Sequence, residues 1–248
     1  MDTNQTTIFT AIIIAVIILA IIIIYFFVTL IRHHRRNIEL YKSKILAEIT
    51  TQENERKRIA ADLHDELGPI LSAVKFKVNS LDLQNGDDEK MLETVNNNID
   101  NIIWRMREIS NDLMPTTLLR KGLVPAIEQS ISNLNRSNNL DVRFNHTNIP
   151  EIKAERSINL YRILQEIIHN TIKHAGATEL KIEMRLDNNT LLILTKDNGK
   201  GFDHIKQSKE NTGLGLRNLL SRTEVLGGDM FIESKPGKGT EYTFEIPL

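Results

Sequence analysis

The stretch Ala60-Ala61-Asp62-Leu63-His64-Asp65-Glu66-Leu67-Gly68-Pro69 is a short polar interruption in a long helical pattern. His64 follows an apolar residue and therefore lies about 100° round a helix from Leu63, on the flank of the buried seam. Its neighbour Asp65 places a carboxylate beside the imidazole, within reach of solvent. The apolar residues around the stretch recur every three or four positions, which is typical of a helix with one buried stripe; they are Ile59, Leu63, Leu67, Ile70, Val74, Val78 and Leu81.

A second amphipathic helix is predicted to follow. The first helix is expected to end near Leu83, because residues 84–88 combine turn residues with helix N-capping chemistry. The second helix is predicted to run to about Leu113. A hairpin with one apolar face cannot bury that face alone, so we expect residues 53–114 to form a homodimer with a four-helix bundle. The second apolar stripe alternates steps of three and four through Leu92, Val95, Ile99, Ile102, Met106, Ile109 and Leu113.

An uncharged run over residues 8–31 is predicted to be a transmembrane helix, since it is long enough for a hydrocarbon core of about 30 Å. A cleaved signal peptide is the alternative, but no positive residue precedes the run and no small-x-small cleavage site follows it. The basic cluster 32–36 follows directly, whereas Asp2 is the only charged side chain on the other flank. The protein is therefore expected to cross the cell inner (plasma) membrane once, with its N-terminus outside and the rest in the cytoplasm.

Two flanking segments complete the membrane region. Residues 1–7 are expected to form a short external tail, too short for a sensor domain, so control should act in the membrane, in the cytoplasm or through a partner. The cluster 32–36 is expected to contact anionic membrane lipid. Residues 32–52 are predicted to be a juxtamembrane linker helix, continuous with the motif helix or paired as a short coiled coil, with a solvated linker helix as the alternative.

The composition excludes several classes of function. The 31 basic and 32 acidic side chains give a formal net charge of −1, so no global basic field points to direct nucleic acid binding. The absence of cysteine excludes disulfides, thiolate metal sites and cysteine nucleophiles. Aromatic residues make up only 5%, so the core must be aliphatic.

After a predicted connector over residues 115–140, the pattern changes to mixed helix and strand. Hairpins with separate helices are typical of an α+β sandwich, in which one antiparallel-rich sheet is covered on one face by helices. Residues 141–248 are therefore predicted to form one domain. The predicted strands are 141–145, 178–186, 190–195, 229–234 and 240–246, and the predicted helices are 154–175 and 214–226.

One face of the helix over residues 160–175 carries groups suited to Mg²⁺ and phosphate. Glu166, Asn170 and Lys173 lie at i, i+4 and i+7, which places a carboxylate, an amide oxygen and an ammonium on one stripe. For this stripe alone, an ordinary solvated face would be the better interpretation. The buried side is expected to contain Leu160, Leu164, Ile167, Ile168 and Ile172.

Three glycine pairs follow the helix and change that interpretation. Residues 197–201 (Asp-Asn-Gly-Lys-Gly) come directly after a strand, and residues 211–218 open a helix with two glycines that free backbone N–H groups for phosphate oxygens. Residues 237–240 (Gly-Lys-Gly-Thr) add a third pair in the last hairpin. A single pair is typical of a turn, but three in this order behind a Glu…Asn…Lys helix are specific.

Together these motifs make residues 53–248 resemble the sensor histidine kinases of two-component systems, in the subgroup that pairs with NarL/LuxR-type response regulators. Residues 56–68 are similar to the phosphoacceptor box and residues 165–175 to the N box. The glycine pairs resemble the glycine boxes of the ATP-binding fold shared with gyrase and Hsp90-type ATPases. The resemblance implies that the hairpin domain carries the phosphoacceptor and that the C-terminal domain is catalytic and binds ATP.

The resemblance also implies a role for individual residues, with ATP and Mg²⁺ as cofactors. His64 would accept the γ-phosphoryl group while Asp65 holds the proton on the other ring nitrogen, and transfer to an aspartate of a cytoplasmic response regulator would follow. Asn170 would coordinate Mg²⁺. The other implied roles are positioning of metal-bound water for Glu166, phosphate contacts for Lys173 and His174, adenine recognition for Asp197 with Thr240 nearby, and shaping of the pocket and its lid for Gly199, Gly201, Gly213 and Gly215.

Pro69 departs from the pattern, because many members of the subgroup carry a glutamine here that is associated with dephosphorylating the regulator. The sequence leaves open whether phosphatase activity is retained. Pro69 has no N–H to donate to the carbonyl of Asp65 and its ring crowds that carbonyl, so a kink is expected just below His64.

Two other functions compete with the kinase interpretation. A non-kinase ATPase of the same nucleotide fold needs no helical hairpin carrying a His-Asp pair, so the hairpin disfavours it. A membrane-anchored ATP-binding adaptor or pseudokinase is disfavoured because Glu166, Asn170, Asp197 and the glycine pairs are all present.

Overall fold

The computed structural model describes residues 3–81, 86–137, 140–203 and 213–248. The chain forms two compact units, residues 1–48 and residues 49–248. Helix α1 (Thr3–Asp62) runs without a break through residues 32–52, so the predicted linker is helical. From Ile17 onward the helix includes an 18-residue window with a mean hydropathy of 2.1, which is apolar enough to cross a membrane by length and composition. The first two residues of the predicted external tail lie outside the described ranges.

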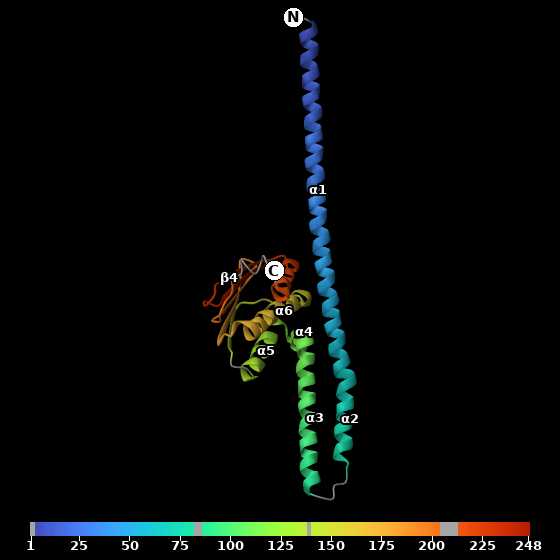
Figure 1. Cartoon of the computed structure of the whole chain (residues 1–248), viewed down its shortest axis with the longest axis vertical. Coiled ribbons are helices and arrows are strands. Elements are labelled where there is room, and N and C mark those ends of the chain that lie inside the picture. The colour runs from blue at the N-terminus through green and yellow to red at the C-terminus, as the bar shows by residue number, and fades with distance from the viewer. Residues whose placement is uncertain (1–2, 82–85, 138–139, 204–212) are drawn as a thin grey trace. The chain divides into compact units, whose positions relative to one another are not determined.

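The predicted helical hairpin consists of the π-helical turn η1 (Leu63–Leu67), α2 (Gly68–Asn79) and α3 (Gly86–Leu113) (Figure 1). The prediction that the first helix ends near Leu83 is wrong, because α2 ends at Asn79. The Ser80 N–H donates to the carbonyl of Phe76 at 3.1 Å, and the Ser80 hydroxyl donates to the carbonyl of Lys77 at 2.8 Å. Ser80 thus satisfies carbonyl groups in the last turn of α2, and the helix ends before Leu83. Leu83 itself lies outside the described residues.

The turn η1 carries His64 and ends two residues before Pro69. Proline cannot donate to the carbonyl four residues back, so the regular α-helical bonding pattern cannot continue through this point. A single π-helical turn accommodates such a break inside a helix, and such turns are frequent at functional sites. The structure thus has a π turn beside His64, while the kink expected from Pro69 stays a prediction.

The C-terminal part is an α+β sandwich, as predicted, and is called the sheet domain below (residues 116–248). Its sheet has the order β1-β2-β3-β5-β4. Strand β1 runs parallel to β2, and the other neighbouring pairs are antiparallel, so the sheet is antiparallel-rich. The strands are β1 (Asp141–Thr147), β2 (Glu179–Asp187), β3 (Thr190–Asp197), β4 (Asp229–Ser234) and β5 (Thr240–Pro247).

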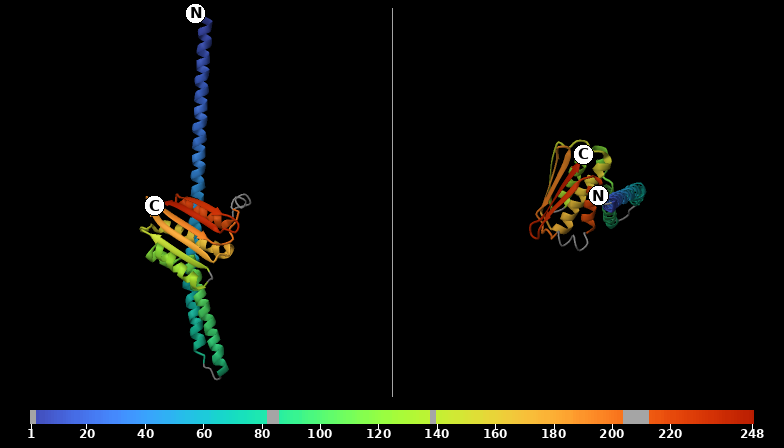
Figure 2. Two further views of the ribbon diagram at one scale, coloured as in Figure 1. Left: turned by 90° about the vertical axis from the view of Figure 1, so that its left-hand side faces the viewer. Right: turned by 90° about the horizontal axis from the view of Figure 1, so that it is seen from above.

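Helices cover one face of this sheet (Figure 2). Leu180, Ile182 and Met184 of β2 are buried beneath them, whereas the residues that alternate with these side chains are exposed on the other face. Leu118 and Ile127 belong to the same core, so the segment predicted as a connector packs with the sheet. The covering helices are α4 (Thr116–Lys121), α5 (Leu123–Ser137), α6 (Ala154–Asn170) and α8 (Leu214–Val225).

Helix α6 changes geometry just after Asn170. The turn η2 (Thr171–Ala175) is π-helical and is followed by Gly176 in the left-handed conformation, with φ of 61°. A π turn holds more residues than an α turn, so the buried face shifts along the sequence. Thr171 is therefore buried, and the prediction that Ile172 faces the core is wrong, because Ile172 is 42% exposed.

Candidate functional site

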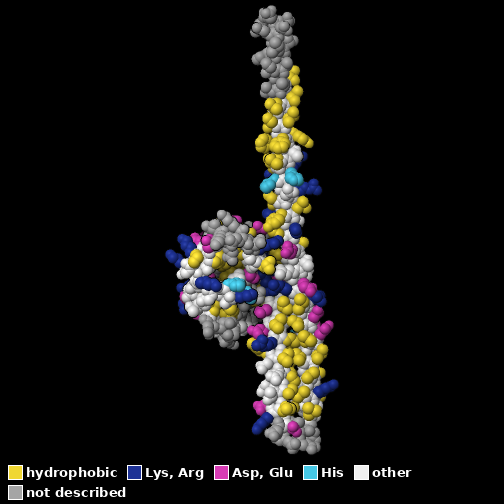
Figure 3. Space-filling view, in the orientation of Figure 1, with side chains coloured by type: hydrophobic (Ala, Val, Ile, Leu, Met, Phe, Trp, Pro, Cys, Tyr) yellow, Lys and Arg dark blue, Asp and Glu magenta, His cyan; other side chains and the backbone are white. Residues whose placement is uncertain are grey.

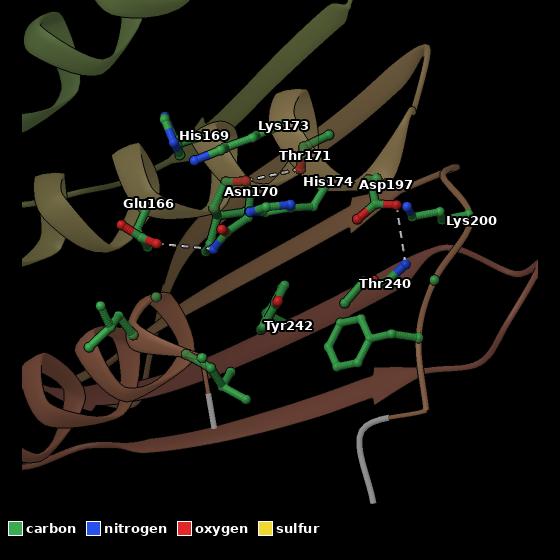
Figure 4. A pocket seen from close by; sticks show the side chains of 18 residues that line it. Glu166, His169, Asn170, Thr171, Lys173, His174, Asp197, Lys200, Thr240 and Tyr242 are labelled. Atoms are coloured by element: carbon green, nitrogen blue, oxygen red, sulfur yellow. Dashed lines mark hydrogen bonds between the residues drawn. The ribbon is translucent and has the colours of Figure 1, made fainter. Parts of the chain in front are cut away.

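A cavity of about 600 Å³ lies between α6, η2, the start of α8 and the ends of β3 and β5 (Figure 4). Its volume is within the range of about 300–1,000 Å³ that is usual for small-molecule sites. Nine of the predicted site residues line it: Glu166, Asn170, Lys173, His174, Asp197, Gly201, Gly213, Gly215 and Thr240. The fold thus brings together residues from four separate motifs: the helix stripe and the three glycine pairs.

Asp197 ends β3, and Thr240 begins the neighbouring strand β5. The Oδ1 atom of Asp197 accepts a hydrogen bond from the backbone N–H of Gly199 at 2.8 Å. It also accepts one from the backbone N–H of Thr240 at 3.3 Å (Figure 4). Burial raises the pKa of Asp197 above its ordinary value, and the two N–H groups partly offset that effect. One carboxylate oxygen is fixed by the backbone, so the other is oriented to accept a hydrogen bond from a ligand.

Glycines allow the backbone to pass closely around Asp197. A Cβ atom on Gly199 would lie 2.6 Å from the Cβ atom of Ala175. Gly201 and Gly239 have φ of 58° and 75°, and a side chain on either would overlap backbone carbonyls. Gly199 does not itself line the cavity but packs against Ala175, which does. These three glycines therefore shape the wall through backbone contacts.

The other end of the cavity collects polar groups from α6, η2 and α8. Asn170 Nδ2 donates to Glu166 Oε1 at 3.2 Å (Figure 4). Lys173 and His174 follow in η2 and add an ammonium and an imidazole. Gly215, in the first turn of α8, faces the Glu166–Asn170 pair, because a Cβ atom there would overlap Glu166 Oε1 and lie 3.2 Å from Asn170 Nδ2. The first turn of a helix also presents backbone N–H groups that suit phosphate oxygens.

Tyr242 and Ser234 are among the contributors to this site that were not predicted. Tyr242 lines the cavity and is only 6% exposed; burial and the nearby charges of Asp197 and Glu166 raise its pKa to about 12. The Ser234 hydroxyl lies 3.0 Å from that of Thr240 and accepts the N–H of Phe202 at 2.9 Å. The alternation of residues along β5 places Tyr242 on the same face as Thr240, and this signal could have identified it.

His64 and Asp65 lie outside this cavity, on η1. His64 Nδ1 is 3.0 Å from Asp65 Oδ1, and both side chains are 76% exposed. Within the described part of the chain, no residue of η1 lines the cavity. The structure therefore places His64 in contact with Asp65 and assembles the cavity, but it does not bring the His64–Asp65 pair to the cavity.

Comparisons with known proteins assign the helical hairpin and the sheet domain to the same class of protein. Residues 55–118 match the family model described as histidine kinase, and residues 155–248 match the family described as histidine kinase-, DNA gyrase B- and HSP90-like ATPase. The chain therefore belongs to the histidine kinases. Within that class, the model matched by the hairpin is that of the subgroup paired with NarL/LuxR-type regulators, as predicted.

The curated relatives are sensor kinases. The chain is 30% identical over 221 residues to the oxygen sensor histidine kinase NreB of Staphylococcus carnosus, covering 86% of this chain and 62% of that protein. It is 32% identical over 207 residues to the sensor histidine kinase MctS of Rhizobium johnstonii, covering 80% of this chain and 44% of that protein. The chain thus spans less than two thirds of either relative.

Among solved structures, the chain is similar to the histidine kinase domain of the blue-light activated histidine kinase of Erythrobacter litoralis EL346. The TM-score is 0.47 at 14% identity, with 80% of this chain and 94% of that chain covered.

Proposed function

We propose that this protein is a membrane-anchored sensor histidine kinase. It phosphorylates its own His64 from ATP and then passes the phosphoryl group to an aspartate of a NarL/LuxR-type response regulator. The observation that carries this proposal is that one chain combines an exposed His64–Asp65 pair on a helical hairpin with a separate cavity lined by the Glu166–Asn170 pair, Asp197 and glycines.

The cavity has groups suited to both ends of ATP. Asp197 offers a carboxylate oxygen to the adenine amino group, while Lys173, His174 and the first turn of α8 offer donors to the phosphates. Asn170 and Glu166 supply the hard oxygen ligands that Mg²⁺ prefers, and they would hold it beside the phosphates. Mg²⁺, when bound, offsets the negative charge on the phosphate oxygens.

His64 supplies the nucleophile in the proposed reaction. Asp65 faces Nδ1, so it retains the proton on that nitrogen and leaves Nε2 with a free lone pair. Nε2 forms a bond to the γ-phosphorus of ATP, the bond to the bridging oxygen breaks, and ADP leaves. The phosphoryl group is then transferred from Nε2 to a carboxylate oxygen of the regulator, which restores the imidazole.

The protein is proposed to act as a homodimer. Figure 3 shows hydrophobic side chains gathered along the hairpin of α2 and α3. A single chain leaves these side chains exposed although they follow a heptad pattern, so a second hairpin would cover them. The exposed members of the two stripes are Ile59, Leu67, Ile70, Val74, Leu81, Val95, Ile102 and Ile109.

The apolar part of α1 and the basic residues 32–36 support a membrane anchor. Because basic residues favour the cytoplasmic side, the hairpin and the sheet domain are proposed to be cytoplasmic, in a chain that crosses the membrane once. The same basic residues are proposed to contact anionic lipid headgroups.

The test is incubation of the full-length protein in detergent micelles with γ-labelled ATP and Mg²⁺, beside the His64→Gln variant. The kinase proposal predicts label on the wild type and none on His64→Gln. An adaptor would bind ATP without becoming labelled, and a non-kinase ATPase would release labelled phosphate without labelled protein. Label that persists in His64→Gln, or that never appears on the wild type, would contradict the proposal.

A further inference from the structure

One carboxylate, that of Glu53, holds two buried arginines. Arg222 Nη2 lies 2.7 Å from Glu53 Oε1, and Arg162 Nη2 lies 3.1 Å from Glu53 Oε2. The side chains of Arg162, Arg222 and Glu53 are only 3%, 7% and 12% exposed. Glu53 belongs to α1, Arg162 to α6 and Arg222 to α8. The cluster therefore fastens the two helices that border the nucleotide cavity to the helix that leads into His64.

Arg162 also binds the C-terminal end of α3. It donates from Nη1 to the carbonyl of Asp112 at 2.8 Å and from Nη2 to the carbonyl of Leu113 at 2.5 Å. The last carbonyls of a helix lack partners within the helix and favour a cation. Arg162 thus joins both helices of the hairpin to the sheet domain, and in the part of the chain that the structure describes only Glu53 forms an ion pair with it or with Arg222.

A third arginine makes the cluster dependent on Glu53. Arg56 lies one turn further along α1 and lines a second cavity, of about 300 Å³, together with Arg162, Arg222 and Glu166. Burial and the charge of Arg162 lower the pKa of Arg56, and the carboxylates of Glu53, Glu166 and Asp112 partly offset this effect. Removing one partner of a buried ion pair leaves a buried charge uncompensated. Without the Glu53 carboxylate, Arg162 and Arg222 would therefore disfavour this packing.

The position of the cluster along α1 keeps the nucleotide cavity away from His64. Glu53 precedes His64 by eleven residues, which is about 16 Å of helix, and Arg56 precedes it by eight, which is about 12 Å. The second cavity places Glu166 beside Arg56. Phosphoryl transfer requires the reacting atoms to be about 3–3.5 Å apart. A phosphate held near Glu166 must therefore move along α1 before it can reach the His64 of the same chain.

We propose that Glu53 is a positioning residue that holds the sheet domain in an inactive arrangement, and that release of Arg162 and Arg222 is a step in activation. This inference rests on the proposed kinase function. The two ion pairs share one carboxylate, so a small rotation or shift of α1 breaks both together, which is the property of a two-state contact. Movement of α1 would thus release the sheet domain from α1, while Arg162 keeps its hydrogen bonds to the last carbonyls of α3.

The first experiment compares full-length Glu53→Gln with the wild type. Glutamine keeps the size of the side chain but removes its charge, and Glu55→Gln is the matched control, because Glu55 is exposed and pairs with Arg58. We expect Glu53→Gln to raise the initial rate of His64 labelling by about five-fold or more with an unchanged KM for ATP, and Glu55→Gln to stay within about two-fold of the wild type. A purely structural role would lower the rate instead.

The second experiment locks the arrangement. The chain contains no cysteine, so Glu53→Cys with Arg222→Cys can be joined specifically by a short bis-maleimide. We expect the uncrosslinked double variant to label His64 and the crosslinked one to bind ATP without labelling. Labelling at equal rates, or a Glu53→Gln rate at or below that of the wild type, would overturn the positioning role. A wild type that never labels would contradict the kinase function itself.

Discussion

His64 Nδ1 lies 3.0 Å from Asp65 Oδ1, and the two residues share a π-helical turn. The contact orients the imidazole without burying it, since both side chains are 76% exposed. A carboxylate that binds one ring nitrogen fixes the tautomer and leaves the other nitrogen free. The proposed phosphoacceptor is thus oriented by Asp65 while its side chain remains exposed.

This relationship predicts the effect of Asp65→Asn. An amide carries no negative charge to stabilise the imidazole proton on Nδ1, and it can also present its NH₂ group, which favours the wrong tautomer. We expect the initial rate of His64 labelling to fall by about 10- to 100-fold, with an unchanged KM for ATP. Glu66→Gln, which changes the next carboxylate along the chain, is the control and should retain the wild-type rate.

Gly215→Ala should impair the phosphate end of the cavity without unfolding the protein. The new Cβ would overlap Glu166 Oε1, and this carboxylate can move aside because it ends a flexible side chain. Displacing it disturbs the Glu166–Asn170 pair, so we expect labelling to fall by about ten-fold or more. The midpoint of thermal unfolding should stay within about 2 °C.

Gly213→Ala provides the matched control for that change. Gly213 precedes α8, and among the described residues no atom lies within 4 Å of a Cβ built on it. Equal losses of labelling in the two alanine variants would show that Glu166 is not the cause.

The raised pKa of Asp197 leads us to expect that both the stability of the fold and its affinity for ATP depend on pH. Burial raises its pKa in the folded state, so the folded protein binds this proton more tightly than the unfolded chain. The stability that Asp197 contributes is therefore lost as the pH rises from the ordinary aspartate pKa through the raised value, and stays lost above it. ATP affinity should change in the opposite sense, since the ionised carboxylate is the better acceptor for the adenine amino group.

Asp197→Asn tests both effects at once. At neutral pH, the ATP-free variant should unfold at a temperature no lower than that of the wild type, because no charge is buried. Its ATP affinity, measured by calorimetric titration, should be lower by about ten-fold or more and should no longer fall as the pH is lowered. A variant that binds ATP as well as the wild type would remove Asp197 from the binding site.

Pro69 predicts a change in phosphatase activity. Pro69→Gln restores a backbone N–H for the carbonyl of Asp65, so the π turn should revert toward a regular α-helix. It also introduces the amide found at this position in many members of the subgroup. We expect faster dephosphorylation of the purified phosphorylated regulator. Pro69→Ala, which restores the N–H alone, separates the two causes, and an unchanged rate with Pro69→Gln would refute the prediction.

Local patterns predicted most of the fold because its elements obey them. Alternation along β2 and heptad steps along α3 gave both the element types and the faces that they present. The errors lie where the backbone leaves regular geometry. Ile172 is exposed because η2 shifts the helical phase, and α2 ends early because Ser80 satisfies its last carbonyls. No periodicity reveals either event.

Sequence motifs predicted the residues of the candidate site, but they did not predict the contacts between residues that are far apart in the chain. Glycine spacing pointed to the surroundings of Asp197, but the contact of Gly215 with Glu166 depends on how α8 packs on α6. The Glu53 cluster joins residues 109 and 169 positions apart, so no local pattern encodes it. The one sequence feature that pointed to this cluster was Arg162, a charged residue inside the otherwise apolar segment Leu160–Leu164.

The most direct test of the central claim is to find where the phosphoryl group resides. After full-length protein is incubated with ATP and Mg²⁺, mass spectrometry of its peptides under neutral or alkaline conditions should detect one phosphorylated residue, His64, within residues 60–69. The modification should disappear on brief acid treatment, because phosphohistidine is acid-labile. A stable phosphate on serine or threonine, or an unmodified His64 in protein that binds ATP, would contradict the account.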